Sequence, residues 1–204
     1  MSADLYKRAT SFVLAFHGCD RATGEAVLAG TEQLQPSKNE YDWLGDGVYF
    51  WEGNPARALD FAQRAAADAK LTTKGKIKDP FVVGAVIDLG VCFSLQDSAC
   101  LAELPVAYDF FKKNCEVAGI QLPQNVRGPD KVVRYLDCAV ILAMHHLRST
   151  ATPEPLIEYD SVRCAFTEGQ ALYPGGFFYE KTHVQIAVRN PQKCILGYFR
   201  PRGY

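Results

Sequence analysis

The sequence predicts a single α+β domain, because short apolar runs with strand character alternate with segments whose apolar residues have helical spacing. The apolar runs 12–17, 47–51 and 81–89 are typical of strands. The middle third, at about 98–149, has helical spacing, and the last third returns to strands between 161 and 199. We therefore expect all 204 residues to form one domain with a helical insertion in the middle.

Glycines and prolines set the boundaries of the elements in the first third. The apolar strand Phe12–His17 is expected to stop at Gly18, and the short helix in ATGEAVLAG is expected to end at Gly30. A polar, turn-rich loop, 31–46, then leads to the aromatic strand. Pro55 favours the start of the next helix, because a proline at the first helical position loses no hydrogen bond.

The rest of the chain contains two helical segments and then three strands. The helical segments are CLAELPVAYDFFKKNCEVAG and DKVVRYLDCAVILAMHHLRS, separated by a loop that contains proline and glycine. The strands are SVRCAFTEG, HVQIAVRN and CILGYF, and the loop QALYPGGFFYE separates the first two. A chain of this length buries enough surface to need no disulfide or metal for folding.

Composition and charge exclude several classes of protein. The chain is 48% apolar and 22% charged, and its net charge of −1 argues against a surface built for non-specific DNA binding, though not against a local basic groove. None of the seven cysteines forms a CxxC pair or a Cys/His set with zinc spacing, so we expect reduced thiols and no metal. The sequence shows neither a secretory signal nor an apolar run of about 18 residues. We therefore expect a cytoplasmic protein with no membrane partner.

Two strands carry polar aromatic side chains next to glycines. His17 can donate a ring N–H to a ribose hydroxyl, and Gly18 lets a ligand amide approach the backbone closely. Tyr49 and Trp51 alternate with apolar residues and so share one face of their strand. Taken alone, each is more simply explained by packing inside the protein. Taken together, Tyr49 and Phe61 as aromatic plates and Gly18 as the backbone edge suit a flat heteroaromatic amide, which favours NAD as the ligand.

The motifs Phe16-His17-Gly18 and LGDGVYFWEGNPARALDFA resemble the poly(ADP-ribose) polymerase group of ADP-ribosyltransferases. That group has a His-Gly pair on one strand and a GxGxYF strand after it, and His17-Gly18 and Tyr49-Phe50 match these elements. The chain also resembles a family of small bacterial proteins of mostly unassigned role, which share a YDWLGxGxYFWE core and a late VRNP segment. The resemblance implies an ADP-ribosyltransferase-like split β-sheet core with flanking helices.

Two further parts of the resemblance lie in the next helix and in a late strand. Ala58 and Phe61 match the small residue and the stacking aromatic that contact nicotinamide, with a one-residue difference in the loop before them. The resemblance places Gln185 where the family has a catalytic glutamate that bonds the ribose 2′-hydroxyl. A glutamine can make this hydrogen bond, but it lacks the charge that stabilises an oxocarbenium-like transition state.

Two acidic residues are candidates to supply the missing charge. Glu168 ends one expected strand, and Glu180 precedes Gln185 by five residues. Glu158 is a weaker third candidate. The alternatives are that these are solvated surface carboxylates, and that the domain binds NAD with little turnover.

Other polar residues have less specific interpretations. Tyr41 and Trp43, in the loop before the glycine turn, offer stacking surface for a nucleobase or close an edge of the core. The tandem His145-His146 has no acid at metal spacing and is expected to be satisfied internally or exposed. Five basic residues are expected on a solvated face, with a polyanion groove as the alternative: Arg127, Lys131, Arg134, Arg200 and Arg202.

The resemblance implies an NAD-dependent ADP-ribosyltransferase that moves a single ADP-ribose unit to a protein or a nucleic acid, as a toxin, a defence factor or an effector. The nicotinamide would lie between Tyr49 and Phe61 with its amide on Gly18, while His17 and Gln185 orient the ribose. A toxin would have an antitoxin or immunity protein as a partner. NAD glycohydrolysis and non-catalytic binding of NAD or ADP-ribose are the alternatives.

Overall fold

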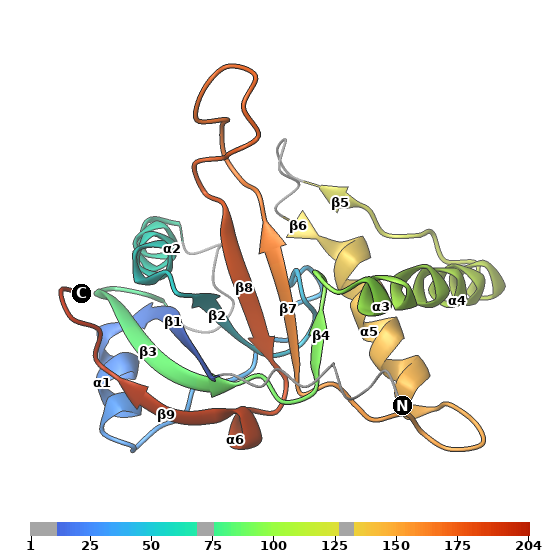
Figure 1. Cartoon of the computed structure of the whole chain (residues 1–204), viewed down its shortest axis with the longest axis horizontal. Helices are drawn as coiled ribbons and strands as arrows, with labels where there is room; N and C mark the ends of the chain where they lie inside the picture. Colours follow the sequence, from blue (N-terminus) through green and yellow to red (C-terminus); the bar gives the residue numbers. More distant parts are fainter. Residues whose placement is uncertain (1–11, 69–75, 127–132) are drawn as a thin grey trace.

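A mixed seven-stranded sheet flanked by helices forms the centre of the protein (Figure 1). The computed structural model describes residues 12–68, 76–126 and 133–204. The strands stand in the order β4-β7-β8-β2-β1-β3-β9. Their bounds are β1 Phe12–Asp20, β2 Val48–Glu52, β3 Pro80–Asp88, β4 Cys92–Ser94, β7 Ser161–Phe166, β8 His183–Val188 and β9 Ile195–Phe199. Strands β4 and β7 are parallel and the other neighbours in this sheet are antiparallel, which confirms the α+β class.

Two helices pack on opposite faces of the β1–β3 part of the sheet. They are α1 (Arg21–Leu28) and α2 (Pro55–Ala67). Val27 of α1 packs in the same cluster as Val83, whereas Ala58 of α2 packs in the same cluster as Val82. Successive residues of a strand face opposite sides, so the two helices cover different faces. We name these the α1 face and the α2 face of the sheet.

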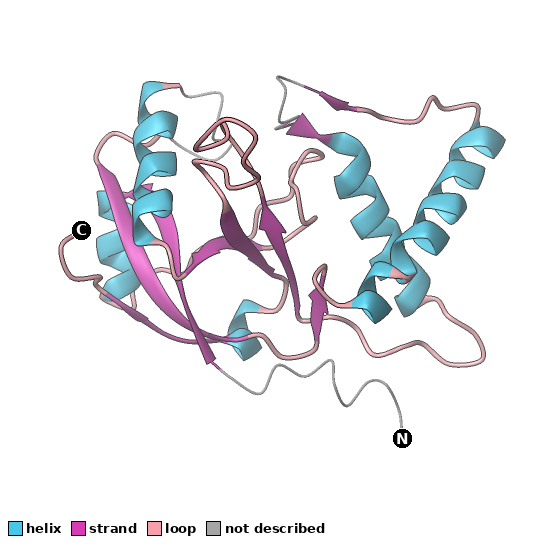
Figure 2. Cartoon of the chain, turned by 45° about the horizontal axis from the view of Figure 1, so that its top comes forward, coloured by secondary structure: helices cyan, strands magenta, loops and turns pink. Residues whose placement is uncertain are grey.

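The middle of the chain forms a helical layer at the β4–β7 end of the sheet, far from α1 and α2 (Figure 2). This layer contains α3 (Ser98–Leu101), α4 (Glu103–Ala118), the small hairpin of β5 (Asn125–Val126) and β6 (Val133–Arg134), and α5 (Tyr135–Ser149). Met144 of α5 and Tyr159 are buried in one cluster with Val162 of β7, which joins this layer to the sheet. The short helix α6 (Pro191–Cys194) precedes β9.

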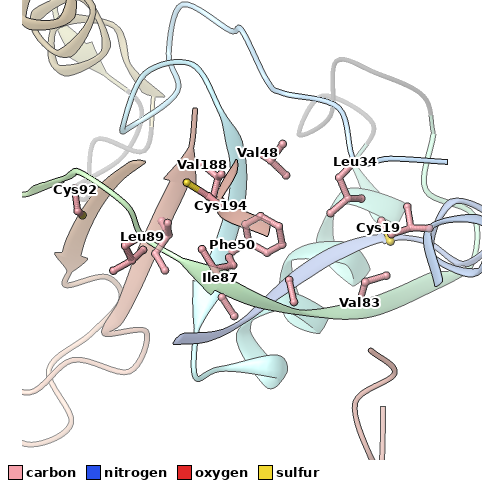
Figure 3. Packing of buried hydrophobic residues seen from close by; sticks show 14 of the residues in the cluster. Cys19, Leu34, Val48, Phe50, Val83, Ile87, Leu89, Cys92, Val188 and Cys194 are labelled. Carbon is pink, nitrogen blue, oxygen red and sulfur yellow. The ribbon is translucent and has the colours of Figure 1, made fainter. Parts of the chain in front are cut away.

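The core on the α1 face is assembled from strands that are far apart in the sequence. Phe50 lies among Val48, Ile87 and Val188 (Figure 3). All seven cysteines lie in the described ranges and are free thiols, as expected, and Cys164 is the one among them that is not buried.

Most expected elements are confirmed, but the end of the first strand is not. Strand β1 continues past Gly18 to Asp20, because its last residues pair with β3 as far as Pro80. The glycine is needed for a different reason. A Cβ at this position would lie 2.1 Å from the Ala58 carbonyl oxygen, so a side chain would prevent α2 from approaching the strand.

The two predicted helix starts have different outcomes. Helix α2 begins at Pro55 as predicted, and the Asn54 side chain accepts a hydrogen bond of 3.0 Å from the Arg57 N–H. The later helix was expected from Asp130, but α5 begins at Tyr135, because the residues just before it form β6. Residues 130–132 lie outside the described ranges.

Candidate functional site

Strands β1 and β2 pair over only two residues and then part. The paired positions are Ala15 with Glu52 and Phe16 with Trp51. Beyond Phe16, β1 continues only in its ladder with β3, and β2 pairs with β8. We refer to this end of the β1–β2 pairing as the ladder break.

The backbone groups of Gly18 lack a ladder partner at this break. The Leu14 carbonyl accepts a 2.8 Å hydrogen bond from the Gly53 N–H, so Leu14 directs its backbone groups toward β2. Gly18 has the same orientation, because the direction alternates along a strand. One more ladder step would bond the Gly18 N–H to the Tyr49 carbonyl, but the register stops before that step. Gly18 therefore offers one backbone donor and one acceptor, the two groups that a primary amide complements.

The His17 side chain takes the place of the missing ladder bond. Its Nδ1 lies 2.8 Å from the Tyr49 carbonyl oxygen. A carbonyl only accepts, so Nδ1 carries the proton and Nε2 is left as an acceptor. Burial lowers the pKa of His17, which keeps the ring neutral. The ring group that we expected to donate to a ribose hydroxyl is thus used inside the protein, and Nε2 can accept from such a hydroxyl instead.

The side chains beside the break come from both faces of the sheet. The His17 ring contacts Phe50, at 5.7 Å between ring centroids, on the α1 face. Trp51 packs with Ala58 on the α2 face, and alternation places Tyr49 on the same face, as predicted. Gln185 is opposite Trp51 in the β2–β8 ladder and therefore also lies on the α2 face.

Tyr49 uses its hydroxyl within the protein. The hydroxyl donates to the Gly45 carbonyl at 2.6 Å and accepts from the Leu44 N–H at 2.9 Å. Burial raises the pKa of Tyr49 well above its ordinary value, so the hydroxyl stays protonated. Tyr49 therefore fixes the glycine turn before β2, and its ring packs toward the helical layer.

The aromatic ring beside Phe61 belongs to Trp51. The two ring centroids are 5.1 Å apart, and the rings are tilted by 40°. Trp51 is 5% exposed, and its indole Nε1 is buried with no hydrogen-bond partner in the described ranges. A buried N–H without a partner costs about 1–3 kcal/mol, which a ligand acceptor would recover. Of the two plates expected at Tyr49 and Phe61, the structure pairs Phe61 with Trp51 instead.

Gln185 lies half-buried in the middle of β8, between Trp51 of β2 and Cys164 of β7. The described residues make no hydrogen bond with its side-chain amide. Its position opposite Trp51 is therefore compatible with an amide that can bond a ligand hydroxyl.

Glu168 is buried and paired with a cation. Its carboxylate bonds the Arg57 guanidinium of α2, and the two side chains are 8% and 11% exposed. Arg57 also donates to Asp60 at 2.6 Å. Of the candidate acids, Glu168 is the one held against α2, but Arg57 offsets its charge. Nothing in the sequence indicates that Arg57 would pair with Glu168. The place of Trp51 beside Phe61 could have been predicted, because Trp51 follows Tyr49 by two residues and so lies on the same face of the strand.

The other two acids lie elsewhere. Glu180 is exposed in the loop that projects between β7 and β8 (Figure 1), where its carboxylate accepts from the Gln170 N–H at 3.2 Å. Glu158 is exposed, and its carboxylate lies 3.9 Å from the guanidinium of Arg189. Arg189 follows Val188, so this pair lies at the end of β8 that is farthest from His183. Neither position supports a role beside Gln185.

Tyr41 and Trp43 contact the helical layer. The Tyr41 ring meets Tyr135 edge-on at 6.0 Å, and the Trp43 ring lies 4.5 Å from Phe166. Arg134 stacks over Trp43 at 4.2 Å. These contacts favour the interpretation that the loop containing Tyr41 and Trp43 closes an edge of the core. Arg134 packs on this loop and does not lie on a solvated face as expected.

The remaining polar residues separate into exposed and buried groups. Arg200 pairs with Glu25 at 2.5 Å near the surface, and Arg202 is exposed. Arg127 and Lys131 lie outside the described ranges. His146 is exposed and stacks on Phe110, while His145 is buried and its Nε2 has no described partner. The expectation of a satisfied histidine is therefore wrong for His145.

Comparisons with known proteins add one short similarity. No protein-family model matches the chain, and no solved structure matches it. A 37-residue segment is 46% identical to part of a protein of Methanocaldococcus jannaschii that is named as uncharacterized. The segment covers 18% of this chain and 17% of that protein. The chain thus spans under a fifth of the relative's length.

Metal-ligand clusters and membrane-spanning helices are both absent from the part of the chain that the structure describes. No group of three or more His, Cys, Asp or Glu side chains is arranged to hold a metal ion in these ranges. None of the described helices has the length and apolar content that a membrane span requires.

Proposed function

We propose that the protein is an NAD-dependent ADP-ribosyltransferase in which the ladder break binds the nicotinamide end of NAD. The observation that carries the proposal is the loss of the β1–β2 ladder at Gly18. Its free N–H and C=O suit the nicotinamide carboxamide. The Trp51 and Phe61 rings lie on the α2 face, beside the same helix that covers Gly18.

The other groups at the site have roles in orientation. The His17 Nε2 accepts from a ribose hydroxyl, and the Gln185 amide bonds the 2′-hydroxyl of the nicotinamide ribose. The bond between C1′ and the nicotinamide nitrogen breaks, and its electron pair leaves with nicotinamide. An oxygen or nitrogen of the acceptor then bonds C1′ and loses its proton. Orientation and preorganised dipoles supply the acceleration.

The Arg57–Glu168 pair favours a second candidate, binding of NAD with slow turnover. The transition state carries positive charge on the ribose, and a carboxylate would stabilise it. Gln185 is neutral, and the charge of Glu168 is offset by Arg57. The same site would then hold NAD or ADP-ribose without rapid transfer.

Labelled NAD separates these functions. The protein is incubated with NAD labelled in the adenosine part, together with cell protein, RNA and DNA. We expect label on one class of macromolecule together with free nicotinamide. Release of nicotinamide with no labelled macromolecule would indicate glycohydrolysis. Binding without release would indicate the second candidate, and neither binding nor release would contradict the proposal.

Two variants test the site itself. Gln185→Glu adds the missing charge, so we expect nicotinamide release to rise by about tenfold or more. Tyr198→Phe on β9 is the matched control, because it removes one aromatic hydroxyl on a strand away from the ladder break. Equal release by Gln185→Glu and the wild type would argue against Gln185 as the residue facing the ribose.

A further inference from the structure

A cavity lies between the helical layer and the α2 face of β7. Its volume is about 640 Å³, within the roughly 300–1,000 Å³ range of small-molecule sites. Leu104, Tyr108 and Val140 line it from the helices, and Cys164 and Phe166 line it from the strand. Its walls are mainly apolar, so it favours a ligand with an apolar body.

One cation marks the polar end of this cavity. The Arg134 guanidinium stacks over Trp43 and Phe166, at 4.2 and 5.1 Å from the ring centroids. Arg134 Nη1 lies 3.3 Å from an Asp137 carboxylate oxygen. Its Nε is buried and has no hydrogen-bond partner within the described ranges. The guanidinium is therefore held in place by aromatic stacking, and Arg134 and Asp137 are the charged residues that line the cavity.

We propose that this cavity binds a flat aromatic molecule that carries one acidic or carbonyl group. The aromatic body packs between Trp43, Phe166 and the aliphatic side chains of the helices. The oxygen of the acidic or carbonyl group accepts from the Arg134 guanidinium. A purely aliphatic ligand would fill the volume but leave the stacked guanidinium N–H without its acceptor.

The cavity is distinct from the ladder break but adjacent to it. Cys164 is opposite Gln185 in the β7–β8 ladder, and both residues face the helix-covered side. A ligand in the cavity would thus lie one strand away from Gln185. The proposal does not depend on NAD, because none of the residues that carry it belongs to the ladder break.

Binding of the aromatic sulfonate dye anilinonaphthalene sulfonate to the full chain tests the proposal. We expect one saturable site by calorimetry. Val140→Trp fills the cavity and should weaken the dye by about tenfold or more. Leu142→Trp is the matched control, because Leu142 is exposed on the same helix and does not line the cavity. Arg134→Lys keeps the charge but removes the stacked planar guanidinium, so it should weaken the dye several-fold.

A second measurement needs no substitution. Cys164 lines the cavity, and it alone among the seven thiols is not buried, so the dye should slow its alkylation by a maleimide. The alkylated peptide is followed by mass spectrometry. An unchanged alkylation rate, equal affinities of Val140→Trp and Leu142→Trp, or displacement of the dye by NAD would each overturn the proposal. If Val140→Trp fails to fold, protection of Cys164 decides.

Discussion

The two candidate sites are built from different parts of the chain, although Trp51 and Gln185 at the first and Cys164 at the second share the α2 face of the sheet. At the ladder break the important groups belong to the backbone of Gly18, and the His17 side chain replaces one ladder bond. At the cavity the important groups are side chains, with Arg134 stacked between a loop and a strand. The first site depends on where two strands part, and the second depends on the shape left between a helical layer and a sheet.

The use of backbone groups at one site and side chains at the other determines which ligands each site can recognise. A backbone donor and acceptor at fixed spacing select a primary amide, and they tolerate little movement. An apolar cavity with one stacked cation selects size and flatness, and it tolerates variation in the ligand. Substitution of Gly18 at the ladder break should therefore cost stability as well as binding, whereas substitutions at the cavity should affect mainly binding.

The largest expected effect is at the ion pair that ties α2 to the loop after β7. Arg57→Met leaves the Glu168 carboxylate buried without its cation, and it should lower the free energy of unfolding by about 3 kcal/mol. The double variant Arg57→Met with Glu168→Leu should regain most of the loss. Urea unfolding of the two variants measures this. If the double variant is no more stable than Arg57→Met, the cost does not come from an unpaired carboxylate.

Gly18→Ala should destabilise the protein by about 2–3 kcal/mol, because its Cβ would meet the Ala58 carbonyl of α2. Gly197→Ala on β9 is the matched control, since a Cβ there meets no atom within 4 Å. The melting temperatures of the two variants make the comparison. A Gly18→Ala protein as stable as Gly197→Ala would show that α2 can move away from β1.

The helical layer offers an effect that is absent near neutral pH and grows as the pH falls. Burial, helped by Arg189 and Arg148, lowers the pKa of His145 to about 3. The unfolded chain binds a proton there near pH 6.5, so the stability is complete above that pH and falls as pH drops toward 3. Removing the group with His145→Leu should reduce the pH slope of unfolding by about 1.4 kcal/mol per pH unit between these limits. His146→Gln, at the exposed neighbouring position, should keep the slope, and equal slopes in both variants would contradict the assignment.

The smallest effect is expected at Trp51. Trp51→Phe keeps an aromatic ring beside Phe61 but removes the unpartnered Nε1, so NAD affinity should fall by about fivefold, or about 1 kcal/mol. The stability should change little, because the packing lost with the smaller ring is offset by removal of the unpartnered N–H. Calorimetric titration with NAD measures the affinity, and Tyr198→Phe is again the control. An unchanged affinity would place the NAD amide or ribose away from the indole.

Local signals in the sequence were enough to predict the helix start at Pro55 and the shared face of Tyr49 and Trp51. The ladder break was not predictable, because it depends on which strand β1 continues to pair with. The Arg57–Glu168 pair joins residues that are 111 positions apart, and no local pattern connects them. The extension of β1 beyond Gly18 was missed because glycine was interpreted as the end of a strand, whereas here it makes room for a helix.

The close approach of α2 to Gly18 also determines how variants of this protein should be interpreted. In a library of all substitutions at position 18, glycine should give the most stable protein, whether or not the protein ever meets NAD. Intolerance at that position is therefore no measure of ligand contact. At position 51, phenylalanine can replace the tryptophan ring and removes the unpartnered N–H. Selection for folding and selection for activity should therefore give different results at that position.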